Sequence, residues 1–423
     1  MLQINYIREN REEAIKKLAK RGFDAKANFE DIIAKDDLRK ETQSKLDDIL
    51  SQSNQIAKEI GAYFKNGEKE KAEEAKAKTV TLKQLSKTLS EKLNKVSYEL
   101  QELLKHIPNA PHDSVPNGKT PEENVVVKEE GDIPKLHSEA LSHWELAAKY
   151  DLIDFELGTK ITGAGFPVYK GKCAKLQRAL INFFLDRNTE AGYLEVQPPL
   201  LVNEASGFGT GQLPDKEGQM YHVTGDNLYL IPTAEVPVTN IFRDVIVKSE
   251  EFPIKYTAYT PCFRREAGSY GKDVRGLNRL HQFDKVEIVQ VQKPSNSYQT
   301  LDEMVQHVTE LLRDLELPFR IVKLCGGDMG FTSALTFDME VYSAAQKRWL
   351  EVSSISNFES YQANRLKLRY KDENKRNVLC HTLNGSALAL PRIVASILEN
   401  HQNEKGIIIP KALVPYTGFE YID

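Results

Sequence analysis

A chain of 423 residues is long enough for two or three domains with a substantial core. Its formal net charge of −4 excludes a strong overall attraction to nucleic acid, so any basic surface that binds one must be local. The four cysteines form no Cys-x-x-Cys pair and no apolar stretch is long enough to span a bilayer, which predicts a cytoplasmic protein without zinc, disulfides or a membrane anchor.

The N-terminal quarter predicts a helical hairpin. One short helix is expected from about Glu12 to Arg21, ended by Gly22. Residues 27–105 then lack proline, and apolar side chains recur at heptad spacing on both sides of Asn66-Gly67, where the chain reverses. The expected seam residues are Leu46, Ile49, Ile56, Ile60 and Tyr63, followed by Leu82, Leu85, Leu89, Val96, Leu100 and Leu103. Two helices of this length project on the order of 50 Å, as a dimerisation coiled coil or as an arm that binds a partner.

A boundary and a larger domain follow the hairpin. Residues 107–135 are dense in proline, asparagine and glycine, which is typical of a linker. Residues 136–423 are expected to form the second domain, with a helix from about Ala174 to Ala191 and a proline-ended strand within 192–202. Farther on, Thr233-Ala234-Glu235 lies between two prolines in a predicted strand-to-helix loop, a pattern that is commonly only a helix cap.

Residues 259–291 predict an antiparallel hairpin with a long polar loop that carries Lys272, Arg275 and Arg279. Alternation places Arg264 and Glu266 on one face of their strand, and likewise Phe283, Lys285, Glu287 and Val289 on one face of theirs. An arginine, two carboxylates and an aromatic ring are therefore expected on a sheet surface. The simplest interpretation is a solvated face with ordinary ion pairs. The combination also suits a nucleotide beside a small zwitterion, because arginine binds phosphate, an aromatic ring stacks on a base, and carboxylates accept from amino and hydroxyl groups.

Two further segments also predict regular secondary structure. FDMEVY and RWLEVSS, within 324–370, predict another hairpin. Residues 380–402 predict a strand, a glycine turn and an amphipathic helix that has Pro391 in its first turn.

The run FRREAGSYGKDVRGLNRLHQFDKVEIV resembles motif 2 of class II aminoacyl-tRNA synthetases, and specifically of seryl-tRNA synthetases of the bacterial type. GYLEVQPPLLV resembles motif 1, with Pro199 at its characteristic proline, and CHTLNGSALALPRIVASILENHQ resembles motif 3. The resemblance covers essentially the whole chain. It implies an α+β fold, in which an antiparallel β-sheet flanked by helices forms the catalytic domain, 136–423. The N-terminal domain, 1–106, then carries the coiled-coil arm that binds tRNA, and motif 1 forms a homodimer.

The resemblance also implies the activity, which is ATP-dependent attachment of L-serine to tRNA(Ser) through a seryl-adenylate, with tRNA(Sec) as a second candidate substrate. The serine-binding residues would be Thr233, Ala234, Glu235, Arg264, Glu287, Asn384 and Ser386. The ATP-binding residues would be Arg264, Arg265, Glu266, Phe283, Glu351, Val352, Ser353, Ser354 and Arg392. Two of these arginines would be catalytic, Arg264 at the α-phosphate and Arg392 at the γ-phosphate.

Glu351 and Ser354 would hold the Mg²⁺ that accompanies ATP. Residues three apart in a regular strand face opposite sides, so this shared role predicts a bulge or a strand end near Ser353.

Two other functions fit the same fold. One is a homologue that activates an amino acid for a carrier protein, which the N-terminal hairpin argues against because such homologues are expected to lack it. The other is a catalytically silent regulator, which the complete set of site residues argues against.

Overall fold

The computed structural model describes residues 1–215, 217–267 and 275–423, and these form two compact units. The smaller unit contains Leu2–Ala19 and Phe23–Pro108. The larger unit contains Met1, Lys20–Gly22 and Asn109–Asp423. Lys272 of the expected polar loop lies outside the described residues.

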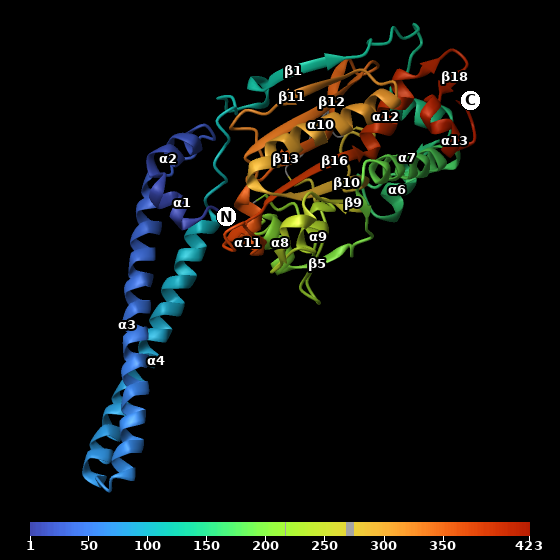
Figure 1. The fold of residues 1–423 in the computed structure, drawn as a ribbon. Coiled ribbons are helices and arrows are strands. Elements are labelled where there is room, and N and C mark those ends of the chain that lie inside the picture. The colour runs from blue at the N-terminus through green and yellow to red at the C-terminus, as the bar shows by residue number, and fades with distance from the viewer. Residues whose placement is uncertain (216, 268–274) are drawn as a thin grey trace. The chain divides into compact units, whose positions relative to one another are not determined.

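The smaller unit is the predicted helical hairpin. Two short helices, α1 (Ile4–Glu9) and α2 (Arg11–Ala19), occupy the lead-in where one helix was expected. The long helices α3 (Lys26–Lys65) and α4 (Lys69–Lys105) pack against each other along their length (Figure 1). Between them Gly67 has φ +77°, a backbone conformation that glycine adopts without strain. The reversal at Asn66-Gly67 is therefore confirmed.

The seam between α3 and α4 agrees with the predicted heptads except at Leu85. That side chain is 44% exposed, whereas Leu82, Leu89 and Val96 are buried or half-buried. The second row of the seam in α4 follows four residues after the first, at Ser86, Leu93 and Leu100. The prediction of Leu85 was wrong because an apolar residue three positions after Leu82 was preferred over a serine four positions after it.

The larger unit is built on a mixed, mostly antiparallel sheet. The described residues give eight strands in the order β1-β11-β12-β13-β16-β10-β9-β4, and only the β4–β9 pair is parallel. Their bounds are β1 Val125–Glu130, β4 Leu194–Glu195, β9 Ile254–Phe263, β10 Gln282–Gln292, β11 Phe319–Lys323, β12 Leu335–Ser343, β13 Arg348–Asn357 and β16 His381–Ala389. This is the α+β architecture expected for the catalytic domain.

The expected linker, 107–135, is partly folded onto the larger unit. Its strand β1 pairs antiparallel with β11 and forms one edge of the large sheet. Asn109 also donates its side-chain amide to the carbonyls of Thr332 and Phe358, 2.9 Å away in each case. The strand was not predicted because its short run Val-Val-Val-Lys is flanked by turn-forming residues, and the composition of the whole segment is that of a linker.

One face of the sheet is covered by α5 (His143–Lys149), α7 (Gly171–Glu190), α10 (Ser297–Asp314) and α12 (Leu390–Asn400) (Figure 1). The main hydrophobic core lies between these helices and the sheet, and it includes Val286, Ile288 and Met339. Smaller clusters on the opposite face involve α9 (Glu235–Asn240) and α11 (Ser360–Leu366), and α8 (Glu204–Thr210) packs against both helices.

The remaining elements lie around this framework. They are α6 (Phe155–Ile161), α13 (Val414–Thr417), β2 (Ile153–Asp154), β3 (Val168–Tyr169), β5 (Leu201–Asn203), β6 (His222–Val223), β7 (Leu228–Leu230), β8 (Ile246–Val247), β14 (Arg369–Lys371), β15 (Asn377–Leu379), β17 (Gln402–Asn403), β18 (Gly406–Ile408) and β19 (Tyr421–Ile422). Within the described ranges, no helix has the length and apolar character needed to cross a membrane.

The motif 3 segment differs from its prediction at Gly385. This residue makes no turn and lies within β16, where an added Cβ would come within 2.9 Å of Ile355 Cγ1. The glycine therefore permits close packing of β16 against β13. Pro391 lies in the first turn of α12, as predicted, where its missing N–H costs no helical hydrogen bond.

Candidate active site

A polar surface crosses four adjacent strands on the face opposite the main core. Because side chains alternate along a strand, β10 presents Lys285 and Glu287 on this face while Val286 and Ile288 enter the main core. Glu287 lies opposite Ser386 in the register of β10 and β16. Asn384 of β16 donates to Glu287 Oε1 at 3.1 Å.

Buried charges are concentrated at Glu287. Its side chain is 1% exposed, and its Oε2 lies 2.6 Å from Lys285 Nζ. Lys285 also donates to Thr233 Oγ1 at 2.9 Å, which joins β10 to the Thr-Ala-Glu loop. The sequence placed Lys285 beside Glu287 but did not identify it as a site residue. A buried carboxylate that is paired in this way can still accept from a substrate hydroxyl or amino group.

Thr233 and Ala234 lie in the predicted connection between β7 and α9, and Glu235 is the first residue of α9. Glu235 is buried, and its Oε1 accepts from Gln362 Nε2 at 2.6 Å. Gln362 is itself held by Thr382, whose hydroxyl donates to Gln362 Oε1 at 2.7 Å. The Ala234 side chain is fully buried in an apolar cluster, so Ala234 can reach a ligand only through its backbone.

Burial raises the pKa of Glu235 to about 7, and the neighbouring Glu287 carboxylate adds to this rise. A substrate ammonium group would restore the charged form by pairing with it. With Thr233, Lys285, Glu287 and Asn384 nearby, this cluster has donors and acceptors suited to a small amino acid that carries a hydroxyl.

Arg264 follows the end of β9 rather than lying within it. The strand ends at Phe263, and Glu266 has φ +49°, so the expectation that Arg264 and Glu266 share a strand face was wrong. The Arg264 guanidinium lies 5.3 Å from the centroid of the Phe283 ring, and its Nε donates to Pro232 O at 3.3 Å. Glu266 instead pairs with Arg279 at 2.5 Å, and Arg265 is exposed.

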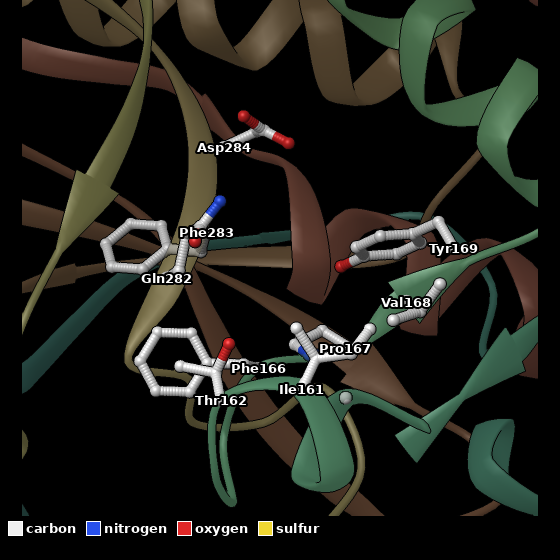
Figure 2. A pocket seen from close by; sticks show the side chains of 10 residues that line it. Ile161, Thr162, Phe166, Pro167, Val168, Tyr169, Gln282, Phe283 and Asp284 are labelled. Carbon is white, nitrogen blue, oxygen red and sulfur yellow. The ribbon is translucent and has the colours of Figure 1, made fainter. Parts of the chain in front are cut away.

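A cavity of about 190 Å³ adjoins the start of β10, where Phe283 and Asp284 form part of its wall. Figure 2 shows Phe166, Pro167 and Tyr169 on its other side. This segment is held against β10 because His281 N donates to Gly165 O at 2.9 Å. Phe283 thus lines the cavity and also contacts the Arg264 guanidinium.

The predicted bulge is present in β13. Met339 of β12 pairs with Ser353, whereas the next residue, Glu340, pairs with Glu351, which leaves Val352 as the extra residue. Val352 enters the main core, and Glu351 and Ser354 lie opposite Glu340 and Asp338 on the site face. The Val352 side chain therefore cannot line the site, and Ser353 Oγ donates to Ser386 O at 2.6 Å.

These strands also supply Asp338, which sequence reasoning missed. Its Oδ1 is buried and has no hydrogen-bond partner among the residues that the structure describes. Burial, followed by the charge of Glu351, holds the pKa of Asp338 well above its usual range. Two close carboxylates and the Ser354 hydroxyl form a fitting set of hard oxygen donors for a divalent cation. Within residues 1–215, 217–267 and 275–423, no group of three or more His, Cys, Asp or Glu residues could hold a metal, so phosphate oxygens would have to complete its shell.

Arg392 projects from the first turn of α12 toward the bulge. It donates from NH1 to Glu351 O at 2.6 Å and from Nε to Asn278 O at 3.2 Å. Its guanidinium is partly exposed and close to the candidate cation ligands. The arrangement therefore places a cationic guanidinium beside the carboxylates of Glu351 and Asp338, as binding of a polyphosphate with a cation requires.

Comparison with known proteins agrees with this geometry. Residues 1–111 match the family model for the seryl-tRNA synthetase N-terminal domain, and residues 221–401 match that for the tRNA synthetase class II core domain (G, H, P, S and T). The serine-tRNA ligase of Salinibacter ruber is 47% identical over 424 residues, which span 100% of this chain and 99% of that protein. The chain belongs to the seryl-tRNA synthetase family.

Solved structures of this family share the fold along the whole chain. The seryl-tRNA synthetase from Pyrococcus horikoshii complexed with ATP has a TM-score of 0.91 at 33% identity, covering 100% of this chain and 99% of that one. The cytoplasmic serine-tRNA ligase from Naegleria fowleri in complex with AMP has a TM-score of 0.87 at 27% identity, with the same coverage. The protein is an aminoacyl-tRNA synthetase with a class II catalytic fold and a helical N-terminal arm.

Proposed function

We propose that this seryl-tRNA synthetase homologue activates L-serine with ATP to form seryl-adenylate and then transfers the seryl group to tRNA(Ser). The observation that carries the proposal is the buried cluster in which Glu235, Glu287 and Lys285 meet beside Arg264. Serine-dependent ATP–pyrophosphate exchange and tRNA charging test it. tRNA(Sec) is the second acceptor to include in the charging assay.

The first step needs positioning and charge stabilisation rather than a strong base. The ionised serine carboxylate attacks the α-phosphorus, a new O–P bond forms, and pyrophosphate leaves with the electrons of the broken bond. Arg264 bridges the attacking carboxylate and the α-phosphate, where negative charge is stabilised. Phe283 stacks on adenine with Glu266 near its amino group, Arg265 contacts phosphate, and Arg392 holds the γ-phosphate.

The second step transfers the seryl group. A hydroxyl at the 3′ end of the tRNA attacks the carbonyl carbon of the adenylate, and AMP leaves. The arm formed by α3 and α4 would bind the tRNA mainly by shape and phosphate contact, because a long helical hairpin offers an extended surface.

Selection of serine follows from the polar side chains around the proposed position of its hydroxyl. Glu287 accepts from the serine hydroxyl, with Asn384 and Ser386 beside it, so alanine leaves a buried acceptor without its partner. Such a site rejects a substrate lacking the hydroxyl by roughly 10⁴-fold or more. Threonine keeps the hydroxyl and is excluded by size, which is the weaker discrimination. We expect pyrophosphate exchange with threonine to exceed exchange with alanine.

Serine binding should depend on the ionisation of Glu235. Because the pKa of this carboxyl is raised from 4.5 to about 7, kcat/KM for serine should fall about tenfold per pH unit below pH 7. Glu235→Gln should remove this inflection and lower kcat/KM throughout. Pyrophosphate exchange from pH 5.5 to 8.5 measures the profile, and a flat wild-type profile between pH 6 and 8 would exclude this role of Glu235.

The same raised pKa affects the stability of the ligand-free protein. Between pH 4.5 and 7 the folded chain retains a proton on Glu235 that the unfolded chain has released. The contribution of Glu235 to the free energy of unfolding therefore decreases as pH rises through this window. Glu235→Gln should show a smaller loss of Tm over that range.

We propose that Asp338, Glu351 and Ser354 hold Mg²⁺ together with the ATP phosphates, where the cation supplies charge neutralisation. Asp338→Asn should raise the Mg²⁺ concentration for half-maximal exchange at least tenfold. Asp314→Asn, in an exposed pair with Arg187, is the matched control. An unchanged Mg²⁺ dependence would remove Asp338 from the cation site.

We also propose a homodimer formed through the motif 1 segment. Its side chains Leu194, Leu200 and Leu201 are 58, 36 and 41% exposed, a high exposure for three neighbouring leucines. A two-fold axis would bring the same patch of each chain together. Light scattering should give about twice the chain mass of 48.0 kDa, and Leu194→Glu should shift the protein toward monomer. A monomeric wild-type protein at micromolar concentration would contradict the proposal.

A further inference from the structure

A buried histidine, His143, connects helix α5 to helix α12, the helix that carries the candidate ATP-binding residue Arg392. His143 lies in the first turn of α5 and Glu399 lies near the end of α12, and both side chains are fully buried. His143 Nδ1 and Glu399 Oε1 are 2.6 Å apart, and the His143 backbone N–H donates to the same oxygen at 2.9 Å. The hydroxyl of Ser343 donates to Glu399 Oε2. The carboxylate is thus held by donors from two other elements.

The other ring nitrogen of His143 holds the base of the motif 2 loop. The backbone N–H of Leu277 donates to His143 Nε2 at 2.8 Å. Because a backbone amide can only donate, Nε2 must carry the lone pair, and the proton must be on Nδ1, facing Glu399. At the adjacent Gly276, with φ +65°, an added Cβ would come within 2.2 Å of His143 Nε2. The loop base therefore lies directly against the ring.

The same network continues to Arg392. Gln346, in the turn between β12 and β13, donates to Glu399 Oε1 at 3.0 Å and accepts from Asn278 Nδ2 at 2.9 Å. The backbone carbonyl of Asn278 accepts from Arg392 Nε at 3.2 Å. Leu277 is consequently fixed by His143 and Asn278 by Gln346, and Asn278 in turn holds the candidate γ-phosphate arginine.

We propose that His143 is a positioning residue for ATP, which acts by fixing residues 275–279 and, through the Asn278 carbonyl, the guanidinium of Arg392. The inference rests on the proposed function, because it assigns the outer phosphates of ATP to Arg392. A network that served packing alone would need no bond to a loop backbone, since an apolar cluster of similar volume is often at least as stable as a buried charged one. Here the bonds converge on the two residues next to Arg392.

Two near-isosteric substitutions separate the two bonds of the ring. The amide of His143→Asn lies near the position of Nδ1, so it keeps a donor for Glu399 and loses the acceptor for Leu277. The amide of His143→Gln lies near Nε2, so it keeps an acceptor for Leu277 and loses the donor to Glu399. The proposal predicts that His143→Asn raises KM for ATP about tenfold or more, with KM for serine within twofold of wild type. His143→Gln should stay within about threefold for ATP.

Direct ATP binding gives a readout that does not depend on catalysis. Arg275 stacks over Trp144 with its guanidinium 4.7 Å from the ring centroid, so Trp144 fluorescence in a Trp349→Phe background reports on this part of the loop. His143→Asn should weaken ATP binding in this titration by the same factor as in KM. If the wild-type protein binds ATP but gives no amino-acid-dependent exchange, the proposed function fails while the binding comparison still tests the role of His143.

Gln346→Ala tests the second link at a half-buried turn residue and keeps the test available if His143 variants fold poorly. It should raise KM for ATP several-fold, whereas Gln299→Ala, which removes an exposed amide paired with Glu303 on α10, should leave it unchanged. Wild-type ATP affinity in both His143→Asn and Gln346→Ala would overturn the proposal. The proposal would also be overturned if His143→Asn and His143→Gln lowered kcat and Tm equally while KM for ATP stayed unchanged in both.

Discussion

Arg264→Ala should lower serine-dependent pyrophosphate exchange by about 10³-fold or more while the protein remains folded. Loss of one preorganised charge-stabilising donor typically costs 10²- to 10³-fold in rate, and this guanidinium is assigned both the serine carboxylate and the α-phosphate. Its own contacts are a hydrogen bond to Pro232 O and stacking on Phe283, so truncation removes little of the core. The exchange rate at saturating ATP and serine, together with Tm, measures the two effects separately.

Two controls sharpen this experiment. Arg264→Lys retains the charge but lacks the planar fork, and it should recover only a small part of the activity. Arg313→Ala removes an arginine of α10 that pairs with Glu130 of β1 and Glu310 of α10. This variant should leave exchange near the wild-type rate. Near-normal exchange in Arg264→Ala would exclude this arginine from the chemistry.

Shortening the arm should abolish tRNA charging without affecting amino-acid activation. Lys35 of α3 pairs with Glu99 of α4, and this register predicts that residue 47 lies opposite residue 87. Replacing 48–86 by a short Gly-Ser turn therefore removes the outer part of the hairpin. It preserves Phe29 and Ile32, which are fully buried at its base.

This variant should catalyse serine-dependent exchange at the wild-type rate and charge tRNA at least 10²-fold more slowly. The reason is that the proposed active-site residues belong to the larger unit, whereas the arm is the proposed surface for tRNA. Charging assays with purified tRNA and exchange assays on the same preparation make the comparison. Unimpaired charging would show that the arm has a different role, such as dimerisation.

Local periodicity predicted the features that depend on neighbouring residues. The α3–α4 hairpin, the β12–β13 hairpin and the first turn of α12 each follow from spacing or from one special residue. The bulge at Val352 was predictable for a chemical reason, because Glu351 and Ser354 could not otherwise share a face.

Contacts between distant segments could not be predicted in the same way. Gln362 reaches Glu235 across 127 positions, and His143 reaches Glu399 across 256, with no local pattern that marks either pair. Asp338 gave only a weak signal, since alternation in FDMEVY places it on one face with Glu340 without showing that this face meets Glu351. Gln362 contacts the predicted residue Glu235 directly, whereas the network around His143 reaches Arg392 only through Asn278.

The central claim is that the cluster of Glu235, Lys285 and Glu287 selects serine for reaction with ATP. The most direct test is ATP–pyrophosphate exchange with each standard amino acid, using the full-length protein at saturating ATP and Mg²⁺. We expect strong exchange with serine, weak exchange with threonine and still weaker exchange with alanine. Exchange driven best by another amino acid, or by none, would contradict it.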